Sequence, residues 1–130
     1  MIIKPKIRGF LCTTTHPTGC EFDVQNQVNY VRKKVRLSGG PKKVLVIGAS
    51  GGYGLASRIS SSFGYGAASV GVFLERPPQA SKTGSPGWYR TAAFSRLAEK
   101  DGIYCANVNG DAFSKPIKDQ VCDLISRDLG

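Results

Sequence analysis

The sequence has no apolar run long enough to cross a membrane, because its longest purely apolar stretches, such as Val44-Leu45-Val46-Ile47, have only the length of a strand. The N-terminus, from Met1 to Lys6, lacks the apolar core of a secretory signal. The whole sequence contains no internal repeat and no low-complexity tract. We therefore expect a cytoplasmic protein with no membrane partner. Its 130 residues, 41% of them hydrophobic, suffice to build the core of one domain.

The sequence also lacks a convincing set of metal ligands. Potential metal ligands occur at intervals of four residues, at Cys12, His16 and Cys20, and this spacing raises the possibility of a metal site. We expect Pro17 and Gly19 to break any helix that would align them, and no clear fourth ligand follows at a zinc-like spacing. The sequence therefore predicts no metal site.

Acidic residues are scarce in the first third of the chain. Residues 1–43 hold nine Lys and Arg against two Asp and Glu, whereas residues 44–130 hold nine against seven, and the net charge is +9. A solvated basic face is the simplest explanation, and an acidic partner, a phosphate-bearing ligand or nucleic acid are the alternatives. Aromatic residues are not interleaved with these cations, which argues against a single-stranded nucleic acid.

Two regions differ in their hydrophobic pattern. In residues 1–41, apolar residues from Phe22 to Leu37 fall close to a helical stripe, and Ser38-Gly39-Gly40-Pro41 ends it. We expect this region to be an N-terminal segment with a basic helix, and residues 42–130 to form the main domain.

Strands alternate with helices in residues 42–130. The predicted strands are Lys43 to Ile47, Ser69 to Leu74 and Ile103 to Val108, and the predicted helices are Leu55 to Phe63, Trp88 to Lys100 and Lys115 to Asp128. This pattern indicates an α/β fold with an open parallel sheet flanked by helices. We expect the domain to be truncated after its third β-α unit, because the last helix should lead to a fourth strand.

A glycine-rich loop, Gly48-Ala49-Ser50-Gly51-Gly52-Tyr53-Gly54, lies between a predicted strand and a predicted helix. This context is typical of a Rossmann-like dinucleotide site, in which Gly48 permits the turn, Gly52 lets the backbone approach the pyrophosphate, and Gly54 lets the helix pack closely. Helix amides and the Ser50 hydroxyl could then donate to the phosphates. No Gly-Lys-Ser/Thr follows, which excludes a P-loop. A turn that binds nothing is the alternative.

Glu75 closes the second predicted strand, 21 residues after Gly54. A Rossmann-like fold places there the acid that accepts from the adenosine ribose, and its charge repels the 2′-phosphate of NADPH, so NADH is the predicted cofactor. The neighbouring Arg76 weakens this inference, and a surface acid without a ligand is the alternative. After the third strand come Asp111 and Ala112, which are placed to contact the edge of the adenine ring in this fold. The alternative is that this stretch is a helix cap followed by a turn, because Asp is a common cap.

Long strings of this sequence resemble the FabV-type trans-2-enoyl reductases, which act on enoyl-acyl carrier protein or enoyl-CoA. They include Met1 to Pro5, Thr14 to Pro17, Val44 to Ser50, Gly52 to Ile59, Gly87 to Tyr89 and Asn109 to Ser114. The resemblance implies NADH-dependent reduction of the trans-2 double bond in fatty acid synthesis. It also implies cofactor contacts at residues 48–53, at Leu74 and Glu75, and at Asp111 and Ala112, with Glu75 linked to the preference for NADH.

The family's catalytic tyrosine and lysine, separated by eight residues, have no counterpart here. None of the five tyrosines is followed by a lysine at that spacing, so we assign no catalytic residue and expect the chain to be inactive alone. The unpaired edge of the first strand, which is apolar, predicts self-association. The alternative function is a non-catalytic nucleotide-binding or interaction module that uses the basic N-terminal region.

Overall fold

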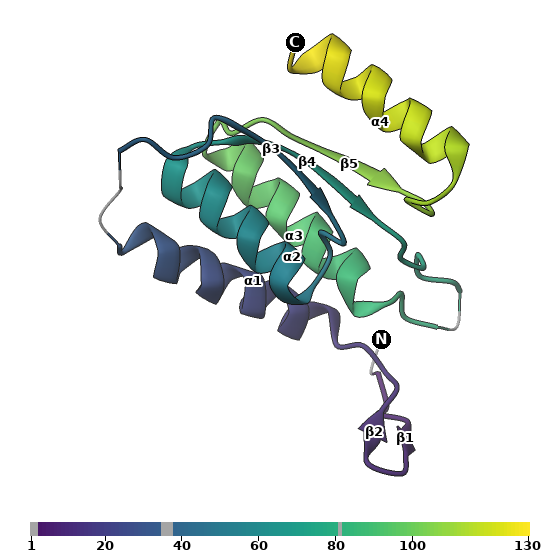
Figure 1. Ribbon diagram of the computed structural model, residues 1–130. Coiled ribbons are helices and arrows are strands. Elements are labelled where there is room, and N and C mark those ends of the chain that lie inside the picture. Colours follow the sequence, from purple (N-terminus) through teal and green to yellow (C-terminus); the bar gives the residue numbers. More distant parts are fainter. Residues whose placement is uncertain (1–2, 35–37, 81) are drawn as a thin grey trace.

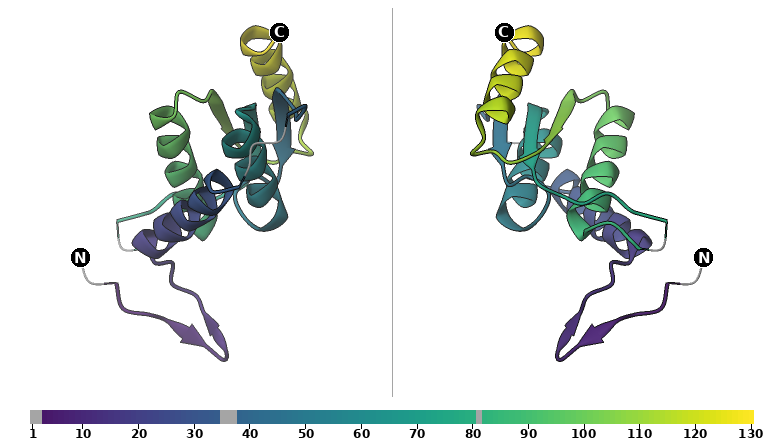
Figure 2. Two further views of the ribbon diagram at one scale, coloured as in Figure 1. Left: turned by 90° about the vertical axis from the view of Figure 1, so that its left-hand side faces the viewer. Right: turned by 90° about the vertical axis from the view of Figure 1, so that its right-hand side faces the viewer.

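Helices cover both faces of a three-stranded parallel sheet (Figures 1 and 2). The structure, a computed structural model, describes residues 3–34, 38–80 and 82–130. The sheet contains β3 (Lys43–Ile47), β4 (Ala68–Phe73) and β5 (Cys105–Asn109), and the main helices are α1 (Pro17–Arg32), α2 (Gly52–Ile59), α3 (Pro86–Lys100) and α4 (Lys115–Asp128). The predicted α/β architecture is therefore confirmed.

The N-terminal part departs from the sequence prediction. Two short strands, β1 (Ile7–Arg8) and β2 (Leu11–Cys12), pair antiparallel in a hairpin that projects from the body (Figure 1). Helix α1 begins at Pro17, five residues before the predicted start, and it includes Gly19; no helix aligns Cys12, His16 and Cys20, as expected. Proline is compatible with a first helical turn because its missing N–H has no partner there. Residues 35–37 of the predicted helix lie outside the described residues.

The helix α1 has a side-chain cap at its start. The Nδ1 atom of His16 accepts a hydrogen bond from the amide of Gly19 at 2.9 Å, which satisfies one of the free donors of the first turn. His16 thus has a structural role. The residues that the structure describes contain no cluster of three or more potential metal ligands.

The sheet has the order β3-β4-β5, with all strands parallel. Lys43 pairs with Ala68, and Ser69 pairs with Cys105, which places the carboxyl ends of the three strands at one edge. The central strand β4 is buried along almost its whole length, as its apolar sequence predicts. The order leaves one edge of β3 unpaired within the described residues.

The two faces of the sheet carry different helices (Figure 2). On one face, α1, α2 and α3 form a core whose buried members are Val24, Val28, Leu55, Ile59, Phe63, Ala93, Phe94 and Ala98. On the other face, α4 packs over Val70, Val72 and Val108 through Val121. Helix α1 thus packs with helices of the main domain, while the division between residues 41 and 42 stays a prediction.

The helix that follows the glycine loop changes its winding after about two turns. At Ser60–Gly64, where the sequence predicts ordinary helix as far as Phe63, α2 passes into a π-helical turn, η1. Phe63 in this turn is buried and meets Phe94 of α3 edge to face, with ring centroids 5.5 Å apart. The wider turn therefore directs an aromatic ring into the core.

A buried arginine of α2 forms hydrogen bonds to both β4 and β5. Arg58 of α2 donates to the Oδ1 of Asn107 at 2.7 Å, to the carbonyl of Ala106 at 2.9 Å, and to the Oγ of Ser69 at 3.1 Å. Its guanidinium also stacks on the ring of Phe94, 4.3 Å from the centroid. Burial lowers the pKa of Arg58 to about 10, so the side chain remains charged at neutral pH. None of the described carboxylates pairs with it.

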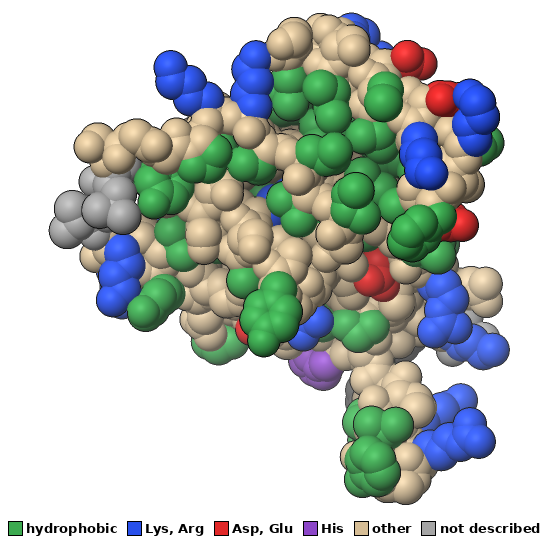
Figure 3. All heavy atoms as spheres, in the orientation of Figure 1, with side chains coloured by type: hydrophobic (Ala, Val, Ile, Leu, Met, Phe, Trp, Pro, Cys, Tyr) green, Lys and Arg blue, Asp and Glu red, His purple; other side chains and the backbone are tan. Residues whose placement is uncertain are grey.

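Apolar side chains are also exposed on the surface. Leu45 and Ile47 of β3 are exposed, and so are Ile7, Phe10 and Leu11 of the hairpin. Figure 3 shows hydrophobic side chains gathered over the area of β3 and α4 and at the hairpin. No helix in the described ranges is both long and apolar enough to span a bilayer.

Candidate functional site

All the predicted cofactor-binding residues lie at one edge of the sheet. Residues 48–53 follow β3, Leu74 and Glu75 follow β4, and Asp111 and Ala112 follow β5. Because the strands are parallel, their carboxyl ends meet at this edge, where open α/β sheets bind ligands. The structure thus brings together three segments that are far apart in the sequence.

The glycine loop adopts backbone conformations that only glycine accepts readily. Gly48 has a φ of +81° and Gly52 a φ of +52°, both in the left-handed region. At Gly54 the restriction is steric, because a Cβ would overlap the carbonyl oxygen of Gly48 and lie 2.8 Å from its carbonyl carbon. The loop and the first turn of α2 are therefore in direct backbone contact.

The loop presents free amides from the start of α2. The amides of Gly48 and Ala49 are already used, since both donate to the carbonyl of Val72, at 2.8 and 3.1 Å. Leu55 is the first helical residue whose amide bonds back, to Gly51 at 3.1 Å. The amides of residues 52–54 therefore lack intrahelical partners, and the positive end of the helix dipole lies with them. This arrangement suits a phosphate.

Arg90 of α3 places a cation beside this loop, which no sequence motif predicted. Its Nη1 lies 3.7 Å from the position that a Cβ on Gly51 would take. Its Nε lies 3.3 Å from a carboxylate oxygen of Asp23 on α1. The guanidinium therefore sits between an acid and the glycine loop, where it adds positive potential to that of the helix N-terminus.

Glu75 is held at both its backbone and its side chain. Asn109, at the end of β5, accepts from the Glu75 amide at 2.8 Å and donates to its carbonyl at 3.0 Å. Ser50 of the glycine loop donates to the Glu75 Oε1 at 2.6 Å. These bonds link the ends of all three strands. Asn109 was not predicted as a site residue, although it lies two residues before the predicted contact at Asp111.

The remaining predicted residues differ in their exposure. Tyr53 is 95% exposed and Leu74 is 74% exposed, so both side chains are free to cover a ligand. Asp111 accepts from the amide of Phe113 at 2.9 Å, which makes a turn that leads into α4. Ala112 is half-buried and packs under α4. The N-cap of α4 is Ser114, so the helix-cap interpretation of Asp111 was wrong, and the adenine role of Asp111 and Ala112 stays a prediction.

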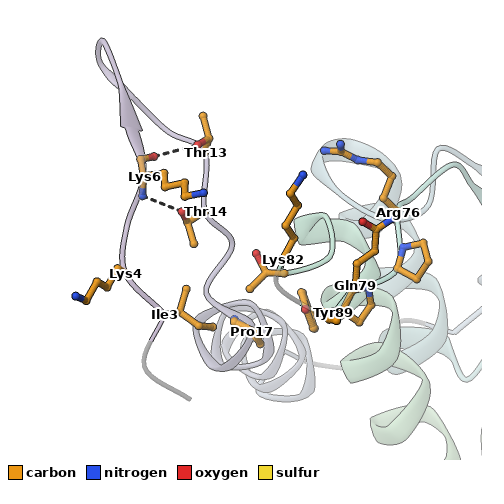
Figure 4. Close-up of a pocket in the computed structure, with 14 residues that line it drawn as sticks. Ile3, Lys4, Lys6, Thr13, Thr14, Pro17, Arg76, Gln79, Lys82 and Tyr89 are labelled. Atoms are coloured by element: carbon orange, nitrogen blue, oxygen red, sulfur yellow. Dashed lines mark hydrogen bonds between the residues drawn. The ribbon is translucent and has the colours of Figure 1, made fainter.

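A cavity lies outside this edge. It has a volume of about 770 Å³ and lies between the N-terminal arm and residues 76–80, 82 and 83. Figure 4 shows Lys6, Lys82 and Arg76 extending toward this space, whereas Lys4 extends away from it. No Asp or Glu of the described residues lines the cavity. It is the feature on which the alternative interaction module would depend.

The fold and the loop together define a nucleotide-binding α/β domain of the Rossmann type. Residues 2–80 match a family described as "NAD(P)H binding domain of trans-2-enoyl-CoA reductase". Residues 82–130 match one described as "Trans-2-enoyl-CoA reductase catalytic region". The chain belongs to the trans-2-enoyl-CoA reductase family, which confirms the resemblance seen in its sequence.

Individual relatives agree with this assignment. The chain is 60% identical over 130 residues to an enoyl-(acyl-carrier-protein) reductase (NADH) of Serratia proteamaculans, and 57% identical to a trans-2-enoyl-CoA reductase (NADH) of Ruminiclostridium cellulolyticum. In both comparisons it is covered completely and spans 33% of the relative. The chain therefore spans about a third of the length of these curated relatives.

Solved structures show the same fold with a cofactor. A trans-2-enoyl-CoA reductase of Clostridium acetobutulicum in complex with NADH has a TM-score of 0.94 at 40% identity, over 100% of this chain and 33% of that one. The Treponema denticola enzyme in complex with NAD has a TM-score of 0.90 at 44% identity, over 98% and 33%. The fold of this chain is thus that of an NAD-binding region.

Proposed function

We propose that this chain forms the NADH-binding part of an enzyme that reduces the trans-2 double bond of an enoyl thioester, carried by acyl carrier protein or by CoA. The observation that carries the proposal is the site edge, where the free amides at the start of α2 and the Glu75 carboxylate, which is bonded to the glycine loop, lie together. The amides suit the pyrophosphate, and the carboxylate accepts from the ribose hydroxyls of the adenosine half.

The chemistry divides between the cofactor and the protein. NADH supplies a hydride for C3 of the enoyl group, and a proton is added at C2. Within this chain, the amides of residues 52–54 and the cation of Arg90 would fix the pyrophosphate, and Glu75 would fix the ribose. No tyrosine-lysine pair at the family's spacing occurs in the sequence, so we propose that the 130-residue chain binds NADH but does not reduce a substrate.

Titration calorimetry with NADH and NADPH tests the cofactor assignment. We expect NADH to bind with a Kd of about 1 μM to 1 mM, and NADPH more weakly, because the Glu75 charge repels the 2′-phosphate. Glu75→Gln removes the charge and keeps the shape, so we expect it to bring the two Kd values within about threefold of each other.

Glu99→Gln is the matched control for this substitution. Glu99 is exposed near the end of α3 that lies away from the glycine loop, so its removal changes the net charge equally without touching the site. We expect it to leave the NADH to NADPH ratio unchanged. A folded wild-type chain that binds neither cofactor would contradict the proposed function.

We also propose that the chain self-associates through the free edge of β3. This edge exposes Leu45 and Ile47 and has unpaired backbone groups within the described residues, which is a template for another strand. Sedimentation at increasing protein concentration is expected to show a dimer or larger species. Leu45→Lys should shift the chain toward monomer, because a charged side chain on an edge disfavours pairing.

Phe10→Lys serves as the comparison, because Phe10 is 96% exposed on the hairpin instead of the sheet edge. If self-association depends on β3, this variant associates like the wild type. Equal loss of association in both variants would assign the contact to general surface hydrophobicity, and a monomeric wild type would exclude self-association altogether.

A further inference from the structure

The Ser50 hydroxyl has one proton, and the structure directs it to a carboxylate. Its Oγ donates to the Glu75 Oε1 at 2.6 Å, which lies in the range of short, charge-assisted hydrogen bonds. A hydroxyl that donates to this carboxylate cannot donate to a pyrophosphate at the same time. The phosphate role given to Ser50 by its place in the glycine loop therefore conflicts with its observed partner.

The surroundings strengthen this bond. Ser50 is 9% exposed and Glu75 is half-buried, so water has limited access to the bond, and a hydrogen bond to a charged group gains strength in such a place. The carboxylate also lies against the first turn of α3. A Cβ on Gly87 would overlap Oε1 and lie 2.6 Å from the Cβ of Ser50.

The backbone of Glu75 is fixed independently by Asn109, through its amide at 2.8 Å and its carbonyl at 3.0 Å. With the backbone held by β5 and Oε1 held by the glycine loop, rotation of the carboxylate is restricted before any ligand binds. Such preorganisation lowers the entropic cost of recognition.

We propose that Ser50 is a positioning residue for cofactor selection. Its hydroxyl holds the Glu75 carboxylate where that group accepts from the ribose hydroxyls of NADH and repels the 2′-phosphate of NADPH. This inference rests on the proposed function, because it concerns how the same site chooses between the two cofactors.

The test is the NADH to NADPH affinity ratio of Ser50→Ala, measured by titration calorimetry. Loss of one charge-assisted hydrogen bond is expected to weaken NADH binding about fivefold and to narrow the ratio by a similar factor. Ser50→Thr keeps the hydroxyl and should restore the ratio. Ser57→Ala, an exposed serine on α2, is the matched control and should leave it unchanged.

Two further variants separate positioning from a general loss of structure. In a Glu75→Gln background, Ser50→Ala should change the ratio no further, because both changes act through one carboxylate. Gly87→Ala keeps the Ser50 hydroxyl but occupies the space of Oε1, so it should narrow the ratio as Ser50→Ala does. This variant also tests the proposal if Ser50→Ala does not fold.

If Ser50→Ala weakens the binding of NADH and of NADPH equally, so that their affinity ratio is preserved, the proposal is overturned. The hydroxyl would then act by donating to the pyrophosphate. This outcome leaves the proposed function intact, since the wild type would still bind and select NADH. Failure of the folded wild type to bind either cofactor would instead overturn both.

Discussion

Replacing Gly54 by alanine is expected to destabilise the fold by about 3 kcal/mol and to reduce NADH affinity more than tenfold. The new Cβ would overlap the carbonyl oxygen of Gly48, which belongs to the backbone and cannot rotate away. The start of α2 must therefore move away from the end of β3, and the free amides of residues 52–54 move with it. Urea denaturation and titration calorimetry measure the two effects.

Gly51→Ala is the stability control in the same loop. A Cβ at this position meets only the Arg90 Nη1, at an ordinary 3.7 Å, and the backbone of Gly51 is extended. We expect its unfolding free energy to stay within about 0.5 kcal/mol of the wild type. If Gly54→Ala were equally well tolerated, the close contact between loop and helix would not be a requirement of the fold.

The second large effect is expected at Arg58. Arg58→Leu leaves the Asn107 Oδ1, the Ala106 carbonyl and the Ser69 hydroxyl without their buried donor. Each unsatisfied group costs about 1 kcal/mol or more, so we expect a loss of about 3 kcal/mol in the free energy of unfolding. Thermal or urea denaturation of the purified chain provides the measurement.

Arg96→Leu provides the comparison, because Arg96 lies on the surface, where its Nη2 forms an ion pair with Glu21 at 2.7 Å, whereas Arg58 is buried and pairs with neutral groups. Exposed pairs contribute little, so we expect a change of less than about 1 kcal/mol. An Arg58→Leu chain as stable as the wild type would mean that leucine packing compensates for the lost hydrogen bonds and the relieved burial of charge.

Local patterns were enough to predict the sheet and the loop. The apolar strands and the glycines at residues 48–54 specify their own conformations, because strand burial and left-handed turns depend on residues close in sequence. The N-terminal region was predicted less well. Phe22 was expected to pack but is exposed, and the start of α1 was missed because proline was treated only as a helix breaker.

The contacts that shape the site are long-range. Asn109 is 34 residues from Glu75, and Ser50 is 25 residues from it, so no local pattern could pair them. The burial of Arg58 could have been predicted from the sequence. Arg58 shares a helical stripe with Leu55 and Ile59, three residues and one residue away, and such a position on an amphipathic helix faces the core.

Because of the π-helical turn at Ser60–Gly64, the number of residues in this segment determines how its side chains pack in the core. Each helical residue advances the next by about 100° around the axis. Deleting one residue from this turn would restore ordinary winding but rotate Phe63 by about that angle, away from the ring of Phe94. Relatives that keep this aromatic contact must therefore keep the residue count here, even where the identities of the serines drift.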